Sequence, residues 1–345
     1  MGAMKSTPIN AMQVECVEPP LHIRRQYLCD RFFFKIVQST SHPLLDKLRT
    51  LSQSLPSNPR SMPCLLLSFR SFSQLSCPTF HSSLSPLYSL PYKALIFKPS
   101  VLLNFGINKG TIEANIVFNE ILNSKWEGWL PMFCDASKLS DDACVGSAVW
   151  IPNSRIILSF KSPPCTSVFT GESIAILEAV RFAQSHKLDK SIIFSDSLSS
   201  LQAIMSNPFR SKSKFPITLK IRQTLFECAL HNLKIVLAWI PGHEGIHGNE
   251  TVDSCAKFAT QSGSLEYYNY FSQDLCLLSL TRLTRTWNEQ WRVSKSVKGK
   301  YYGDIVPDIP VKPWFSSSVN WTKLLFPLSV VFVSAMHAPR FIWQN

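Results

Sequence analysis

The sequence predicts an α/β fold in which a five-stranded mixed sheet lies between two layers of helices. Between residues 129 and 262, three short strand-like runs come first, and helix-like and strand-like segments then alternate. The later strand-like runs, KSIIFSDS and LKIVLAWI, are mostly apolar, as expected of strands that helices cover on both faces. A chain of 345 residues, 45% hydrophobic and 12% aromatic, can bury a sizeable core and is long enough for about two domains.

The first half of this region predicts a meander followed by a helix. WLPMFCDAS, ACVGSAVWI and SRIILSFKS are apolar or alternating runs separated by turn residues, which is typical of consecutive strands. TGESIAILEAVRFAQSHK follows, and Thr170 can cap a helix there. Ile174, Leu177 and Val180 recur at helical spacing and supply its apolar face.

The second half predicts a parallel part of the sheet. KSIIFSDS is a fourth strand that ends in an acidic turn, and SLSSLQAIMS is a short helix. FPITLKIRQTLFECALHN is a longer helix, and LKIVLAWI is the fifth strand. Asn249 begins a last helix, which Gly263 ends.

The flanking regions have a different character. Residues 1–48 contain a helix-like run, in which Leu21, Leu28, Phe32 and Ile36 recur at helical spacing. Residues 49–128 are interpreted as a linker and connection segment; from Thr50 to about Tyr92 they are rich in Ser, Pro and Leu, and no regular structure is predicted there. Residues 263–345 are expected to form a tail that is poorly ordered at its end.

The amino-acid composition argues against a secreted protein and against a membrane-spanning one. Ten cysteines without a Cys-x-x-Cys pair, and an N-terminus without an apolar signal segment, predict a reduced, intracellular setting. No membrane span is expected, because the most apolar run, Leu324 to Met336, is short and contains Pro327. No obligate protein partner is evident. The net charge of +12 favours a polyanionic partner, yet residues 129–262 are nearly balanced, with 13 basic and 11 acidic residues.

Four acidic residues occupy four different predicted elements. Asp135 lies within an apolar strand, and Glu172 opens the first helix. Asp196 ends a buried strand, at the edge where mixed α/β sheets commonly build sites, and Asp253 lies one turn into the last helix. Each acid alone has an ordinary structural explanation, such as a cap or a solvated face. Gathered together they would repel one another, unless two divalent cations such as Mg²⁺ lay between them.

The stretch WIPGHEGIHGNETVD, residues 239–253, allows a second interpretation. HEGIH is the His-Glu-x-x-His pattern of zinc proteases, which needs His243 and His247 on one helical turn. Pro241, Gly242 and the glycines after Glu244 and His247 argue against a continuous helix. An interpretation of His243 and His247 as surface-loop histidines without function is favoured over a zinc site.

Four motifs agree in order and spacing with one known family. FCDAS, TGESIAILEA, FSDSLSSLQAI and WIPGHEGIHGNETVD resemble the type 1 ribonuclease H domain, in the version found at the C-terminal end of insect-type non-LTR retrotransposon polyproteins. The resemblance covers residues 129–262 and implies a three-layer ribonuclease H-like fold. It also implies hydrolysis of the RNA strand of RNA–DNA hybrids with two Mg²⁺ ions, for which Mn²⁺ is a possible substitute.

The resemblance assigns roles residue by residue. Asp135, Glu172, Asp196 and Asp253 match the metal-binding carboxylates, and His243 matches a loop histidine that assists water positioning or product departure. The expected nucleic-acid contacts are Asn249, Ser137, Ser197, Arg210, Lys212 and Lys214. Ala136 departs from the family, which usually has glycine after the first aspartate.

The flanks carry their own resemblance. GAMKSTPINAMQVECVEPPLHIRRQYL is similar to the end of a retroelement reverse transcriptase, although the polymerase motifs themselves are absent. WNEQWRVSKSVKGKYYGDIVPDIPVKPWF is similar to the segment after the ribonuclease domain in such polyproteins. These likenesses imply a retrotransposon-derived enzyme. The alternative is a catalytically weak hybrid-binding remnant, or a decaying gene product without a selected role.

Overall fold

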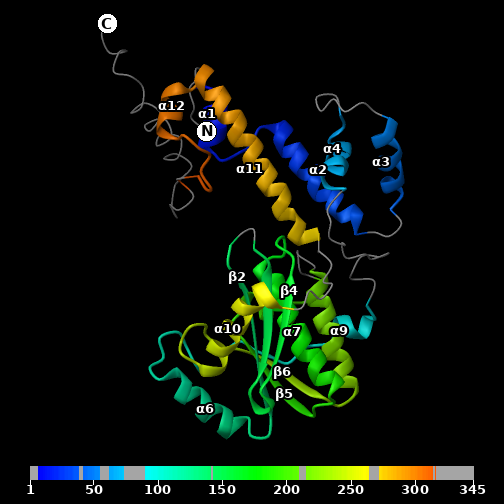
Figure 1. The fold of residues 1–345 in the computed structure, drawn as a ribbon, viewed down its shortest axis with the longest axis vertical. Helices are drawn as coiled ribbons and strands as arrows, with labels where there is room; N and C mark the ends of the chain where they lie inside the picture. The colour runs from blue at the N-terminus through cyan, green and yellow to red at the C-terminus, as the bar shows by residue number, and fades with distance from the viewer. Residues whose placement is uncertain are drawn as a thin grey trace. The chain divides into compact units, whose positions relative to one another are not determined.

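A computed structural model describes residues 7–38, 42–54, 62–73, 90–140, 143–209, 215–263, 272–313 and 315. The chain forms two compact units (Figure 1). One consists of Met1–Phe33, Leu48–Gln74 and Cys276–Asn345, and the other of Phe34–Lys47 and Leu75–Leu275. The interpretation of the flanks as reverse transcriptase remnant, linker and tail stays a prediction.

The second unit is built on a mixed sheet. Its strands are β1 (Val101–Leu102), β2 (Leu130–Lys138), β3 (Val145–Ile151), β4 (Ile156–Ser162), β5 (Lys190–Ser195) and β6 (Lys234–Trp239). Their spatial order is β1-β6-β5-β2-β3-β4, with antiparallel pairing from β2 to β4 and parallel pairing elsewhere. The predicted α/β fold and the predicted order of elements are therefore confirmed.

All five strands predicted within residues 129–262 are present, and the sheet has one more strand than predicted. β1 adds a sixth strand, which pairs in parallel with β6 through Val101 opposite Leu237 and Leu102 opposite Ala238. The backbone N–H of Leu237 also donates to the carbonyl of Ser100 at 2.9 Å. Two residues are too few to show an alternating pattern, so β1 is recognised only through its pairing.

Helices cover both faces of the sheet (Figure 1). One face packs against α7 (Val168–Ser185), α8 (Leu198–Met205) and α9 (Pro216–Leu230), and the other packs against α6 (Ala114–Lys125) and α10 (His247–Ser262). Side chains alternate along β2, so Met132 and Cys134 join the first core and Phe133 joins the second.

An aromatic cluster forms the centre of the second core. Phe194 lies 4.9 Å from both Phe105 and Phe118, and 5.2 Å from Phe133, measured between ring centroids. Phe105 and Phe118 come from residues that precede β2, and all four rings are buried. The segment before residue 129 therefore completes the core beneath this face of the sheet.

Two helices begin earlier than predicted. α7 starts at Val168 and its N-cap is Ser167, whose side chain accepts a hydrogen bond from the Thr170 N–H. Thr170, the predicted cap, lies inside the first turn. α10 starts at His247 rather than Asn249. Both differences reflect the difficulty of choosing among neighbouring cap candidates from sequence.

The predicted linker contains regular structure. α3 (Pro43–Ser54), α4 (Cys64–Phe72) and α5 (Tyr92–Ile96) overlap the segment for which none was predicted. α4 follows an extended Pro63, which is a favoured way to enter a helix, and buries Leu66. α5 is held by Arg222, whose guanidinium donates to the carbonyls of Leu95 and Phe97.

The first unit is helical. It contains α1 (Ile9–Glu15), most of α11 (Ser272–Val297), α12 (Lys300–Ile305) and part of α2 (Leu21–Val37). α2 confirms the predicted helix, but of its four predicted apolar positions only Ile36 is buried. Ala11, Val14, Ile23, Trp287 and Trp291 form a small core in this unit. Within the described residues, no helix is both long and apolar enough to span a bilayer, and the run from Leu324 to Met336 lies outside them.

Candidate metal centre

Two neighbouring parallel strands, β2 and β5, place two aspartates side by side near the carboxyl end of β5. Cys134 of β2 lies opposite Ser195 of β5, so the next residues, Asp135 and Asp196, follow side by side. Glu172 reaches the same place from α7, just after its first turn. One carboxylate oxygen from each of the three residues lies within 4.8 Å of the others. We call these residues the carboxylate triad.

Burial and mutual repulsion perturb the triad. Asp135 and Glu172 are only 6% and 7% exposed. Burial, together with the charge of Asp196, raises the pKa of Asp135 to about 7. Burial, with Asp135 next in importance, also raises the pKa of Glu172, and burial raises that of Asp196 despite favourable interactions with His243 and Asn249. The three groups therefore resist ionising together unless a cation joins them.

The donor set fits a hard divalent cation. Oε2 of Glu172 and Oδ1 of Asn249 are buried, and neither has a hydrogen-bond partner within the described part of the chain. Asp135 Oδ1 accepts a 2.7 Å bond from the Ala136 N–H, which orients its carboxylate. Mg²⁺ and Mn²⁺ prefer such oxygen ligands, and a cation would relieve the cost of an unpartnered buried carboxylate oxygen.

Two glycines allow close approach around the triad. A Cβ on Gly242 would lie 2.4 Å from Oδ2 of Asp196, so only glycine fits at this point of the loop after β6. A Cβ on Gly171 would lie 3.0 Å from the methyl group of Ala136 and closer still to Val145. The missing side chain of Gly171 thus leaves room beneath α7 for Ala136, the residue that departs from the family pattern.

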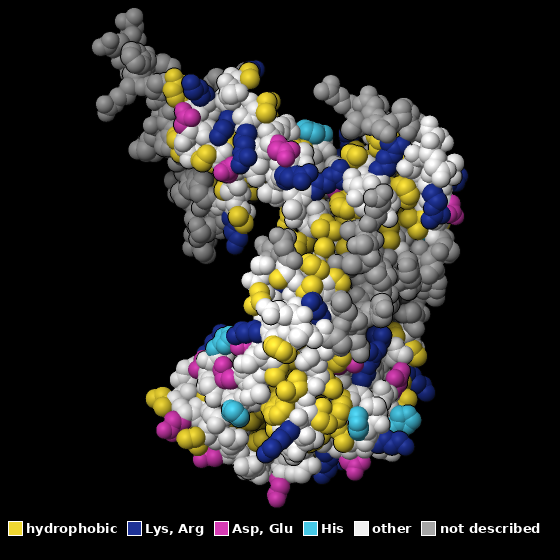
Figure 2. All heavy atoms as spheres, in the orientation of Figure 1, with side chains coloured by type: hydrophobic (Ala, Val, Ile, Leu, Met, Phe, Trp, Pro, Cys, Tyr) yellow, Lys and Arg dark blue, Asp and Glu magenta, His cyan; other side chains and the backbone are white. Residues whose placement is uncertain are grey.

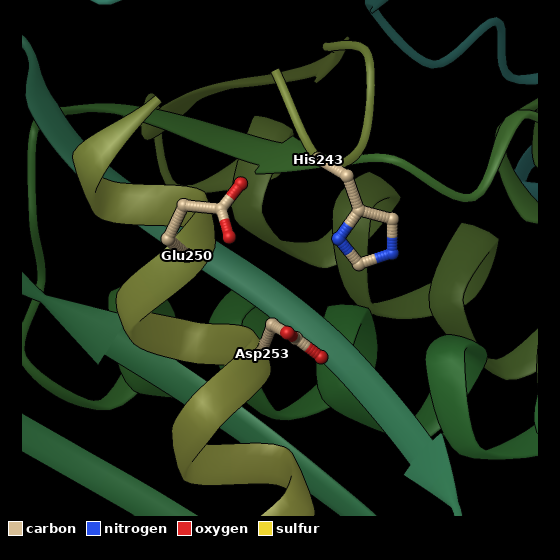
Figure 3. A group of neighbouring side chains, drawn as sticks. All are labelled: His243, Glu250 and Asp253. Carbon is tan, nitrogen blue, oxygen red and sulfur yellow. The ribbon is translucent and has the colours of Figure 1, made fainter. Parts of the chain in front are cut away.

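A second group lies on the loop after β6 and on α10. His243 and the acids Glu250 and Asp253 each offer one ligand atom, and these atoms lie within 4.8 Å of one another. Figure 3 shows His243 on the loop, with its ring beside the two carboxylates of α10. His243 has a left-handed backbone, with φ of 58°. We call these residues the His243 group.

Asp253 was predicted to join the other three carboxylates, and in the structure its carboxylate lies with the His243 group. Its Oδ2 lies 2.6 Å from Nζ of Lys257, one turn further along α10. Asp253 still lies near enough for its charge to raise the pKa of Asp135 and of Asp196. The predicted set of four is thus divided into a buried triad and an adjacent carboxylate that is paired with a lysine.

Glu250 was not singled out from the sequence. It lies three residues before Asp253 and so shares a face of α10 with it, which is the signal that could have identified it. The zinc interpretation of HEGIH is wrong, because His243 lies in a loop and His247 is the first residue of α10. The two histidines do not share a helical turn.

The predicted nucleic-acid contacts have varied positions. Asn249 is 2% exposed, and its side chain acts to lower the pKa of Asp196 against the effect of burial. Ser137 is half-buried at the end of β2, and Ser197 follows Asp196, with its Oγ donating to Ser200 Oγ at 2.8 Å. The three remaining predicted contacts lie outside the described residues: Arg210, Lys212 and Lys214.

Residues 129–261 match the model of the RNase H family. No curated protein matches the chain, whereas 217 chains of solved structures do. One of these is RNase H1 from the halophilic archaeon Halobacterium salinarum NRC-1, which is 15% identical, with a TM-score of 0.30. That similarity covers 38% of this chain and 97% of the archaeal one.

Proposed function

We propose that the RNase H domain formed by residues 129–261 hydrolyses the RNA strand of RNA–DNA hybrids, using divalent cations. The observation that carries this proposal is the carboxylate triad, in which Asp135, Glu172 and Asp196 converge in a buried site. Such an arrangement destabilises the fold in the absence of a cation, and is typical of functional rather than structural acids. The same acidic residues would bind either Mg²⁺ or Mn²⁺.

The triad would hold the cations, and Asp253 would complete the ligand set. Bound cations would supply an activated water and stabilise the leaving oxygen. For Asp253 to act as a ligand, Lys257 must release its carboxylate, which is feasible because the lysine side chain is half exposed. Asn249, whose side chain favours the charged form of Asp196, would help to keep that carboxylate ready to bind a cation.

His243 would act at the edge of the site. Its imidazole is exposed, unlike the triad, and it is close to Glu250 and Asp253. We assign it to orienting the attacking water or assisting departure of the product, by moving a proton at one of its ring nitrogens.

Substrate binding would depend on dispersed contacts. Ser137, Ser197 and Asn249 lie beside the triad and would contact the nucleic acid, and the net charge of +12 favours a polyanion. On the face shown in Figure 2, Lys and Arg side chains are scattered among acidic ones. Recognition of the hybrid by its shape and 2′-hydroxyl groups agrees with such a surface.

We also infer a retroelement origin for the domain. The inference rests on the similarity of residues 2–28 and 287–315 to segments of retroelement polyproteins. Sequencing the genomic locus tests it, because remnants of a polymerase reading frame should precede this coding region. A locus without any such remnant on either side would contradict the inference.

Cleavage of a labelled RNA–DNA hybrid by the full chain tests the proposed activity. The wild type should cut the RNA strand with Mg²⁺, and chelation should stop it. Asp196→Asn should lower the rate by about 10³-fold or more, because it removes a charged triad ligand without changing its shape. Asp189→Asn is the matched control, because Asp189 is exposed and lies just before the start of β5, whereas Asp196 follows the end of that strand.

The outcomes separate the two interpretations of the sequence. Cleavage that Asp196→Asn abolishes and Asp189→Asn leaves unchanged supports the enzyme. Tight binding of the hybrid without any cleavage would instead support the hybrid-binding remnant. Cleavage that survives Asp196→Asn would overturn the assignment of the triad.

A further inference from the structure

A buried carboxylate from outside the family match contacts the helix that carries Glu172. Asp274 lies in the first turn of α11 and is 4% exposed. It lies after the RNase H match, which ends at residue 261. Its Oδ1 accepts hydrogen bonds from the Ser167 N–H at 3.1 Å, from Ser167 Oγ at 2.8 Å and from Thr170 Oγ1 at 2.9 Å. Asp274 therefore binds the start of α7.

These contacts form a closed network at the N-terminus of α7. Ser167 Oγ accepts from the Thr170 N–H at 3.2 Å, so its own proton is free to be donated to Asp274. Thr170 Oγ1 likewise donates to Asp274. A negative charge at a helix N-terminus is favourable, because the first turn carries unsatisfied N–H groups.

Lys138 helps to keep this carboxylate charged. Its Nζ donates to the carbonyls of Pro164 at 2.7 Å and Thr166 at 3.4 Å, in the loop that leads into α7. Burial raises the pKa of Asp274, whereas the hydrogen bonds from Ser167 and Thr170 and the charge of Lys138 act in the opposite direction. Lys138 ends β2, the strand that also carries Asp135.

The first turn of α7 is held from the other side as well. Ser147 Oγ of β3 donates to the Gly171 carbonyl at 2.9 Å, and Gly171 lies directly over Ala136 and Val145. Glu172 is the next residue, and its carboxylate belongs to the triad. A shift of the turn that ends in Thr170 would therefore move a triad carboxylate.

We propose that Asp274 is a positioning residue, which clamps the first turn of α7 through Ser167 and Thr170 and so holds Glu172 in the carboxylate triad. This role rests on the proposed function, since it concerns the same cation site. The functional domain then extends beyond residue 261 into the first turn of α11. Partners that orient metal ligands commonly change metal affinity when they are lost.

Calorimetric titration of the full chain with Mn²⁺ tests the proposal independently of catalysis. Asp274→Asn should weaken Mn²⁺ binding about tenfold and raise the Mg²⁺ concentration needed for half-maximal cleavage by a similar factor. Asp189→Asn, the same substitution at an exposed site, should change neither quantity. Equal behaviour of the two variants in both assays would overturn the proposal.

Thr170 provides a second variant that keeps the proposal falsifiable if Asp274→Asn fails to fold. Thr170→Val removes the hydroxyl with little change in shape and should weaken Mn²⁺ binding, whereas Thr170→Ser retains the hydroxyl and should restore it. The double variant Asp274→Asn/Thr170→Val should bind Mn²⁺ about as well as the weaker single variant, because both changes break one contact. Fully additive losses, or a Thr170→Ser protein as weak as Thr170→Val, would contradict the clamp.

The two proposals fail in different ways. A wild-type chain that binds Mn²⁺ but cuts no hybrid would refute the proposed activity and leave the clamp to be judged by binding alone. A wild-type chain that binds no Mn²⁺ would refute both, because Glu172 would then be positioned for no cation.

Discussion

The carboxylate triad and the His243 group lie close together but are built differently. Two triad members, Asp135 and Glu172, are buried, and two strands and a helix hold the triad in the sheet. The His243 group comes from a loop and one helix, its histidine is exposed, and Lys257 already pairs with Asp253. The triad therefore needs a cation far more than the His243 group does. We infer that the triad forms the stronger cation site and that the His243 group adjusts the chemistry.

Substitutions in the two groups should differ most in their effect on the cleavage rate. Asp135→Asn should lower kcat by about 10³-fold or more, because it removes a charged, buried ligand. Glu250→Gln should lower kcat by no more than about tenfold, since Glu250 is partly exposed and faces His243 rather than the triad. Single-turnover cleavage of a hybrid measures both. Equal losses in the two variants would show that the groups act as one site.

The pH dependence of cation binding should follow the triad. Because the pKa of Asp135 is about 7 in the cation-free protein, cation binding must displace a proton below that pH. Mn²⁺ affinity should rise about tenfold per pH unit between pH 5 and 7 and level off above pH 7.5. Titration calorimetry at several pH values checks this. An affinity that is flat from pH 5 to 8 would contradict a protonated triad.

The cation-free protein should become more stable when the triad loses a charge. The pKa of Asp135 is higher in the folded chain than the roughly 3.9 expected in the unfolded chain, so the folded state binds more protons between these values. Its stability therefore falls as pH rises from about 4 to 7, and stays low above pH 7. At pH 8 with a chelator, Asp135→Asn should raise the free energy of unfolding by about 1–2 kcal/mol.

Urea unfolding of both proteins at pH 8 and at pH 4 measures this effect. The difference should shrink at pH 4, where the carboxyl group is neutral in the folded chain and already about half neutral in the unfolded chain. A wild type that is the more stable protein at pH 8 would show that burial of Asp135 costs little.

The smallest effect should come from Lys257. Its ion pair with Asp253 is half exposed, and such pairs contribute little. Lys257→Met should tighten Mn²⁺ binding by only about twofold, because Asp253 then becomes available without competition. Calorimetry beside Lys161→Met, a lysine on β4, measures the change. Weaker binding in Lys257→Met would mean that the lysine supports the site rather than competing with a cation.

Much of the fold could be predicted because the signals are local. Asp135 lies within one apolar strand and Asp196 directly follows another, and Glu172 follows capping residues at the start of a helix. Neighbouring strands then bring these acids together through sheet pairing alone. β1 and α6 could not be predicted in the same way, because a two-residue strand has no period and α6 lies beyond a Ser/Pro-rich segment.

Parts of the site depend on contacts between distant residues. The network around Asp274 joins residues separated by 104 to 107 positions, and only the folded chain shows it. The pairing of Asp253 with Lys257 is local, yet the sequence does not decide whether Asp253 turns toward the lysine or toward the triad. The inclusion of Asp253 among the metal-binding carboxylates therefore stays a prediction.

The aromatic cluster has a practical consequence for producing the domain. A fragment cut at residues 129 and 261 would lack Phe105 and Phe118 and would expose the rings of Phe133 and Phe194 to water. Each large aromatic side chain buries roughly 150–250 Å², so such a fragment would expose an apolar surface and tend to aggregate. Expression from residue 90 to beyond Leu275 would retain both the aromatic cover and Asp274. Solubility of recombinant fragments thus depends on elements that the family match does not include.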